Sequence, residues 1–149
     1  MGDRVNLTLI GDGPSRTELE ATAAALGLGG RVHWAGYIAD RKPYLEMLAG
    51  RDLFVFPSEA EGFPKVVLDA LAVGLPVLAR PSGALRDLDV IRPMTDLERD
   101  VAALDAGGTD AWSTLARRGH AFARDHVRAT ELDRLVQHWH RRWPNLPWV

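Results

Sequence analysis

The sequence has no cysteine among its 149 residues. This excludes disulfides, thiol catalysis and thiolate metal sites, and it fits a reducing compartment. No apolar run approaches the roughly 20 residues needed to span a bilayer, and residues 1–4 lead into a short strand-like run rather than a signal peptide. The formal net charge of −2 provides no basic field for a nucleic acid. We therefore expect a soluble cytoplasmic protein that does not bind nucleic acid.

Several common functional motifs are also missing from the sequence. It contains no Gly-x-Ser-x-Gly elbow and no P-loop. His138 and His140 lie two residues apart in a predicted helix, so they point to different faces and do not suit a shared metal ion. We expect no metal site and no bound cofactor.

Short strand-like runs alternate with helical periods in the first half of the chain. Strands are expected at residues 5–10, 31–34, 53–56 and 76–79, and helices at 15–26, 43–49 and 65–73. This alternation predicts an α/β fold with a doubly wound parallel sheet. The length and the hydrophobic content of 46% fit a single domain over residues 1–149.

The pattern weakens after residue 80. One strand is expected at residues 89–91 and helices at 95–104, 110–125 and 130–143, so that residues 130–149 form a C-terminal helix and tail. The last helix carries an apolar row made of Leu132, Leu135, Val136, Trp139 and Trp143. This row fits either packing on its own domain or a docking face for a partner.

Two loops directly follow predicted strands, one at residues 11–13 and one at 58–63. Ligands of parallel α/β sheets gather at the carboxyl ends of the strands, so both loops should open on one edge. Pro64 suits the first turn of a helix, which leaves backbone N–H groups directed back toward Gly62. A helix N-terminus of this kind favours a phosphate.

Two carboxylates flank this expected anion site. Glu61 and Asp69 can accept hydrogen bonds from vicinal hydroxyls, which suggests a sugar and a ribose at the two ends of a diphosphate. The plainer alternative is that both are solvated helix charges. Lys65 and Arg16 likewise have two interpretations, as phosphate ligands or as solvated surface residues.

The same residues resemble the signature of the retaining GT-B glycosyltransferases often called group 1. In that family two acidic residues are separated by seven others, as Glu61 and Asp69 are here. The resemblance covers roughly residues 5–84 and rests on four pieces in the family's order, namely residues 9–14 (LIGDGP), 32–37 (VHWAGY), 57–72 and 74–77 (GLPV).

The resemblance implies the C-terminal, Rossmann-like half of a GT-B fold, which binds the donor nucleotide. Such enzymes move a sugar from a nucleotide sugar, such as a UDP-sugar or a GDP-sugar, to an acceptor. The anomeric configuration is retained, usually without an essential metal. A lipid-linked or glycan acceptor would add peripheral membrane association as an alternative to a freely soluble state.

Site roles follow from the same resemblance. Glu61, the predicted catalytic residue, would hold the hydroxyls of the donor sugar, and Asp69 would hold the ribose. The remaining predicted binding residues are Gly62, Phe63, Lys65 and Val66 for sugar and diphosphate, and Gly36, Tyr37 and Ile38 beside the nucleobase. Gly11 and Gly13 would keep the floor of the binding site open.

The sequence departs from the family in several places. Asp69 stands where Glu is common, one methylene shorter. The family's upstream Gly-Arg turn with its lysine and its acceptor-binding domain are not in the sequence, and residues 92–97 show no clear counterpart of a Gly-Leu-Leu-Val strand. Autonomous turnover is therefore not expected, and a noncatalytic nucleotide-binding or protein-interaction module is the alternative function.

The family's first strand is also missing, and it would lie between the strands at residues 5–10 and 53–56. Its loss would leave two central edges without hydrogen-bond partners. Three alternatives remain: the two strands pair with one another, another chain supplies the strand, or the chain is a fragment of a longer enzyme.

Overall fold

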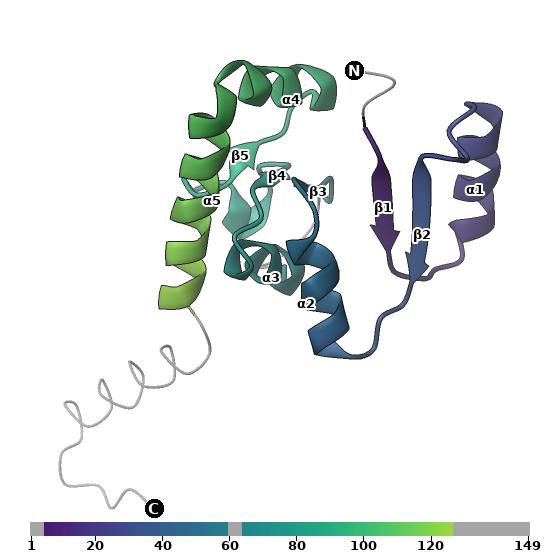
Figure 1. Ribbon diagram of the computed structural model, residues 1–149, viewed down its shortest axis with the longest axis horizontal. Helices are drawn as coiled ribbons and strands as arrows, with labels where there is room; N and C mark the ends of the chain where they lie inside the picture. The colour runs from purple at the N-terminus through teal and green to yellow at the C-terminus, as the bar shows by residue number, and fades with distance from the viewer. Residues whose placement is uncertain (1–4, 60–63, 127–149) are drawn as a thin grey trace, which may run out of the picture. The chain divides into compact units, whose positions relative to one another are not determined.

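The computed structural model describes residues 5–59 and 64–126 of the chain (Figure 1). The chain divides into two compact units, Met1–Met47 and Leu48–Val149. Helices alternate with parallel strands in both, which confirms the α/β class. The predicted C-terminal helix at residues 130–143, with its apolar row, lies outside the described residues. The single domain over residues 1–149 stays a prediction.

The first unit is built on two parallel strands, β1 (Leu7–Ile10) and β2 (Val32–Gly36). Leu7 lies opposite Val32 in the register, and helix α1 (Arg16–Ala25) forms the crossover between the strands. Helix α2 (Arg41–Ala49) then crosses the division between the units.

The second unit contains a three-stranded parallel sheet with the order β3 (Phe54–Phe56), β4 (Val77–Ala79), β5 (Arg92–Pro93). Helix α3 (Lys65–Ala72) connects β3 to β4. Every residue of the central strand β4 is fully buried, whereas β3 is half-buried. The core of this unit therefore lies around β4.

The strands are thus distributed over two parallel sheets. β1 and β2 form the sheet of the first unit, and β3, β4 and β5 form that of the second, so the three alternatives for the missing strand stay open.

The strand expected at residues 89–91 is wrong by position, because the chain pairs with β4 only at Arg92–Pro93. Val90 and Ile91 are buried in the turn before β5, where Ile91 N donates to Leu88 O at 3.4 Å. Their apolar character reflects burial rather than strand pairing. A strand therefore does exist near residues 92–97, although its sequence is Arg-Pro rather than an apolar run.

Two helices complete the second unit, α4 (Leu97–Ala106) and α5 (Gly108–Asp125), with a short 3₁₀ turn η1 (Gly83–Leu85) before β5. Helix α5 packs on α3 and α4 (Figure 1). The approach to α3 depends on Gly119, because a Cβ atom there would lie 2.5 Å from Leu71 Cδ2. One residue further, His120 Nδ1 donates a hydrogen bond to Ala72 O at 2.8 Å.

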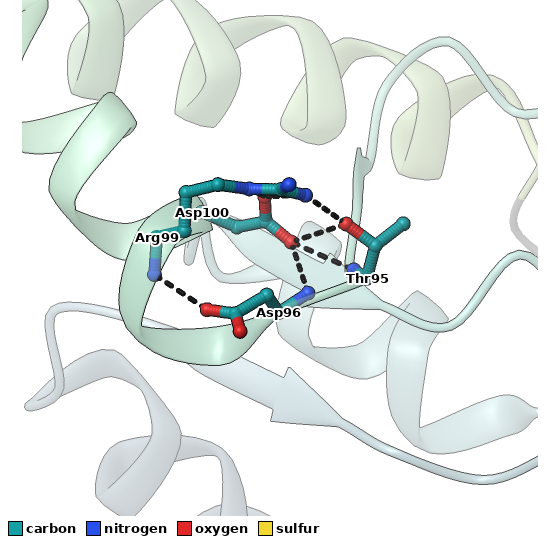
Figure 2. A network of polar contacts seen from close by, with 4 residues as sticks. All are labelled: Thr95, Asp96, Arg99 and Asp100. Atoms are coloured by element: carbon teal, nitrogen blue, oxygen red, sulfur yellow. Dashed lines mark hydrogen bonds and ion pairs between the residues drawn. The ribbon is translucent and has the colours of Figure 1, made fainter.

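The N-terminus of α4 is held by two carboxylates (Figure 2). Asp96 caps the helix by accepting a bond from Arg99 N at 2.8 Å. Asp100 Oδ2 accepts bonds from Thr95 N at 2.7 Å and Asp96 N at 2.9 Å. These backbone donors, with the Arg99 guanidinium beside the carboxylate, lower the pKa of Asp100 from 3.8 to about 2. The chain is thereby fixed where it leaves β5 and enters α4.

We predict that Gly119→Ala lowers the free energy of unfolding. Overpacking against the fully buried Leu71 costs about 1–3 kcal/mol, and the better helix propensity of alanine offsets about 1 kcal/mol of it. The net loss in the free energy of unfolding, measured by urea unfolding, is expected to lie between about 0 and 2 kcal/mol.

Leu71→Val is the matched background for this test, because it removes the atom that a Cβ at position 119 would meet. In that background Gly119→Ala should be neutral or stabilising by up to about 1 kcal/mol, since only the propensity gain remains. An equal loss in both backgrounds would contradict the close contact between α3 and α5.

A second prediction concerns acid stability. Because Asp100 has a folded pKa of about 2, below its usual 3.8, the ionised carboxylate stabilises the fold above about pH 4. That stabilisation is lost as the pH falls toward 2. Asp100→Asn should therefore be less stable at neutral pH and should show a shallower loss of stability between pH 4 and 2. Asp105→Asn, at an exposed carboxylate of the same helix, serves as the control.

Candidate functional site

The predicted anion site lies at the start of α3, in the second unit. Pro64 occupies the N-cap position of the helix, one residue earlier than the first-turn position expected from the sequence, and it is buried. It supplies no side-chain acceptor, and the first turn of α3 carries no acidic residue. Val67 N donates to Pro64 O at 3.1 Å. The backbone N–H groups of Lys65 and Val66, which precede it, have no acceptor within a regular helix.

The two faces of α3 have different surroundings. Val67, Ala70 and Leu71 are fully buried, at the i, i+3, i+4 spacing of one helix face. Lys65 is exposed, Val66 is 38% exposed and Asp69 is half-buried. Lys65, Val66 and Asp69 therefore lie outside the helix face that packs in the core.

The loop before α3 contains three of the predicted site residues. Glu61, Gly62 and Phe63 lie outside the described residues, so their predicted roles on the donor sugar and diphosphate stay predictions. On either side of them, the chain is placed by β3 and by the buried Pro64.

The first unit brings two of its predicted glycines together. Gly11 N donates to Gly36 O at 2.8 Å, where β1 and β2 end. Gly11 has φ +131° and Gly36 has φ +67°, conformations that L side chains rarely adopt. The turn chemistry expected at residues 11–13 is therefore present, and Gly13 O accepts a bond from Arg16 N at 3.1 Å.

The residues that follow β2 differ in exposure. Tyr37 is 78% exposed and Ile38 is half-buried. A pocket of about 240 Å³ lies beside the loop after β1, and Gly11, Gly13, Arg16 and Trp34 are among the residues that line it. The roles of Gly36, Tyr37 and Ile38 beside a nucleobase, and of Gly11 and Gly13 at the floor of a site, stay predictions.

The Arg16 side chain contacts two carboxylates and an aromatic ring. Its Nε donates to Glu20 Oε1 at 2.8 Å, its Nη1 lies 3.7 Å from Asp12 Oδ1, and its guanidinium lies 6.0 Å from the centre of the Trp34 ring. The Glu20 hydrogen bond, followed by the charges of Glu20 and Asp12, raises the pKa of Arg16. The spacing of Asp12, Arg16 and Glu20, four residues apart, was the available signal. These two acidic partners hold the Arg16 side chain beside the loop after β1, and its interpretation as a phosphate ligand stays a prediction.

The described residues contain no group of three or more His, Cys, Asp or Glu side chains that could hold a metal ion. In the same part of the chain, no helix has the length and apolar character required to cross a bilayer.

Comparison with curated proteins identifies similar sequences among glycosyltransferases. The chain is 34% identical over 124 residues to the lipopolysaccharide core biosynthesis glycosyltransferase LpsE of Rhizobium meliloti (strain 1021), covering 78% of this chain. It is 32% identical over 144 residues to a GDP-mannose-dependent alpha-mannosyltransferase of Mycolicibacterium smegmatis, covering 92% of this chain. The match spans 36% of the length of each relative.

Solved structures give the same fold. Anabaena Alr3699/HepE in complex with UDP superposes with a TM-score of 0.73 at 23% identity, over 91% of this chain and 40% of that one. A glycosyltransferase from Rickettsia africae ESF-5 gives a TM-score of 0.74 at 15% identity, over 95% of this chain and 41% of that one. Residues 1–89 also match the sequence profile of the family described as glycosyl transferases group 1. With the profile over more than half of the chain and relatives above 30% identity, the chain belongs to the glycosyl transferases group 1 family.

Proposed function

We propose that this chain binds a nucleotide-sugar donor and provides the donor half of a retaining glycosyltransferase. The observation that carries the proposal is the start of α3, where backbone donors precede a half-buried carboxylate one turn further along the helix. A helix N-terminus whose N-cap residue has no side-chain acceptor suits a diphosphate, and a carboxylate suits the hydroxyls of the attached ribose.

The assignment of individual residues follows the geometry of α3. The N–H groups of Lys65 and Val66 bind oxygen atoms of the diphosphate, and the exposed Lys65 ammonium adds positive charge nearby. Asp69 accepts hydrogen bonds from the ribose. Glu61 orients the donor sugar through its hydroxyls, a role that rests on the family resemblance and on its separation from Asp69 by seven residues.

In the reaction, the bond between the anomeric carbon and the diphosphate oxygen breaks, and the leaving group keeps the electron pair. The acceptor oxygen forms its bond on the same face of the sugar and gives up its proton to an oxygen of the departing diphosphate. The partial positive charge at the start of α3 stabilises the charge that develops on the departing phosphate. No metal ion is required for this step.

The relatives narrow the choice of nucleotide. The Mycolicibacterium relative is named as GDP-mannose-dependent, and Anabaena HepE was solved with UDP and with UDP-glucose. UDP and GDP are therefore the two nucleotides to test first, with ADP as the comparison.

We predict that the purified chain binds one of these nucleoside diphosphates in a calorimetric titration. Asp69→Asn should weaken that binding about tenfold or more, because hydrogen bonds to a charged acceptor contribute about 1.5–3 kcal/mol each. Asp69→Glu, which restores the charge with one further methylene, should bind more tightly than Asp69→Asn.

Glu98→Gln is a matched control, since it removes an exposed carboxylate of the same unit, and it should leave nucleotide affinity unchanged. Circular dichroism checks that each variant is folded. Nucleotide binding that survives Asp69→Asn without change would contradict the ribose role. A folded chain that binds none of the three nucleotides would favour a noncatalytic protein-interaction module.

A further inference from the structure

A second pocket, of about 360 Å³, lies in the second unit and includes none of the residues assigned above to the nucleotide sugar. Its lining combines charged, hydroxyl and apolar side chains. These residues are Glu59, Arg80, Pro81, Ser82, Arg86, Met94 and Thr95.

The pocket lies where ligands of parallel sheets gather. Arg80 directly follows β4, Met94 and Thr95 directly follow β5, and Glu59 lies three residues beyond β3. All three strands run in parallel, so their carboxyl ends meet at one edge. Open parallel sheets bind ligands outside this edge.

Hydrogen bonds hold the walls of the pocket in place. Ser82 Oγ donates to Ser58 O at 3.2 Å, which ties the segment after β4 to the segment after β3. Met94 N donates to Ala79 O at 2.7 Å, which ties the segment after β5 to the end of β4. Leu85 is 1% exposed and anchors the turn from which Arg86 extends. The pocket is therefore built on the sheet and the core.

The charged side chains that line the pocket, two arginines and one glutamate, carry a net charge of one positive unit. Arg80 forms an ion pair with Glu59 on the surface of the unit. Arg86 is exposed, and in the described part of the chain no carboxylate lies within ion-pair distance of it. Ser82 already donates its hydroxyl hydrogen, so the available donors of this pocket are mainly the two guanidinium groups.

We propose that this pocket binds a phosphate group between Arg86 and Arg80. Guanidinium groups bind phosphate oxygens through paired N–H donors. The two positive charges of Arg80 and Arg86 are balanced more completely by a phosphate dianion than by the single carboxylate of Glu59. Arg86 supplies the donors that have no partner, and Arg80 exchanges Glu59 for the ligand. The phosphate arrives either as free inorganic phosphate or as the ester group of a sugar phosphate.

The test is calorimetric titration of the whole chain with inorganic phosphate and with glucose 1-phosphate, using glucose as the uncharged comparison. At least one of the phosphates should bind, and glucose should not. Arg86→Gln should weaken phosphate binding about tenfold, the effect expected for loss of a charge-assisted hydrogen bond. Arg92→Gln removes an exposed arginine that does not line the pocket, and it should change nothing.

Glu59→Gln is the most discriminating variant, because the direction of its effect on phosphate affinity tests the proposal. Removing this carboxylate frees Arg80 and should tighten phosphate binding severalfold. A weaker or unchanged affinity would overturn the proposal, as would binding of neither phosphate by a folded chain. Glucose 1-phosphate binding tenfold more tightly than inorganic phosphate supports a sugar phosphate as the ligand, and equal affinities support free phosphate.

The result does not depend on the nucleotide site. Asp69→Asn should leave phosphate binding at this pocket unchanged, and Arg86→Gln should leave nucleoside diphosphate binding unchanged. Lys65→Gln should likewise leave phosphate binding unchanged, because Lys65 lies at the start of α3 and does not line the pocket. Loss of phosphate binding in Lys65→Gln would overturn the pocket proposal, because the phosphate would then occupy the start of α3.

Discussion

The close approach of α5 to α3 at Gly119 is the constraint on which the second unit depends. Because position 119 has no side chain, Leu71 can fill the space against α5 and be fully buried. With Val67 and Ala70, it fixes the rotation of α3 about its own axis, and the His120 bond to Ala72 O holds the far end of the helix. A helix fixed at one face and one end has a defined N-terminus and a defined polar face. The proposed diphosphate and ribose contacts both require this.

Burial of β4 explains why charged residues gather at the strand ends. Val77, Leu78 and Ala79 are fully buried, so polar groups are excluded until Arg80, where the chain leaves the sheet. β5 differs, because Arg92 and Pro93 are exposed. After it Met94 is buried, and the next residue, Thr95, donates hydrogen bonds to Asp100. A short, fully buried central strand thus separates an apolar interior from an edge at which guanidinium and carboxylate groups remain accessible.

Periodicity predicted much of the fold, because burial follows the same spacing that the sequence displays. Residues 65–73 and 76–79 were placed correctly to within a residue or two by their apolar patterns. Residues 89–91 were misplaced because Val90 and Ile91 are buried in a turn, and composition alone does not distinguish burial from strand pairing. The Glu59 to Arg80 pair could not be foreseen either, since it joins residues from two segments that only the sheet brings together. Asp96 is a residue type favoured at helix N-caps, and its position is a sequence signal for the observed start of α4 at Leu97.

The N-termini of α3 and α4 differ in the groups available to bind their backbone N–H donors. Both helices begin with backbone N–H groups that lack intrahelical acceptors. At α4 the chain supplies its own anions, since Asp96 caps Arg99 N and Asp100 binds the N–H groups of Thr95 and Asp96 (Figure 2). At α3 the N-cap is Pro64, which has no side-chain acceptor, and no acidic residue occupies the first turn. An internal carboxylate at the start of α3 would compete with an incoming phosphate for the same donors. Among residues 64–72 none occupies the N-cap or the first turn, in contrast to α4, and this contrast is consistent with the proposal of an external anion at α3.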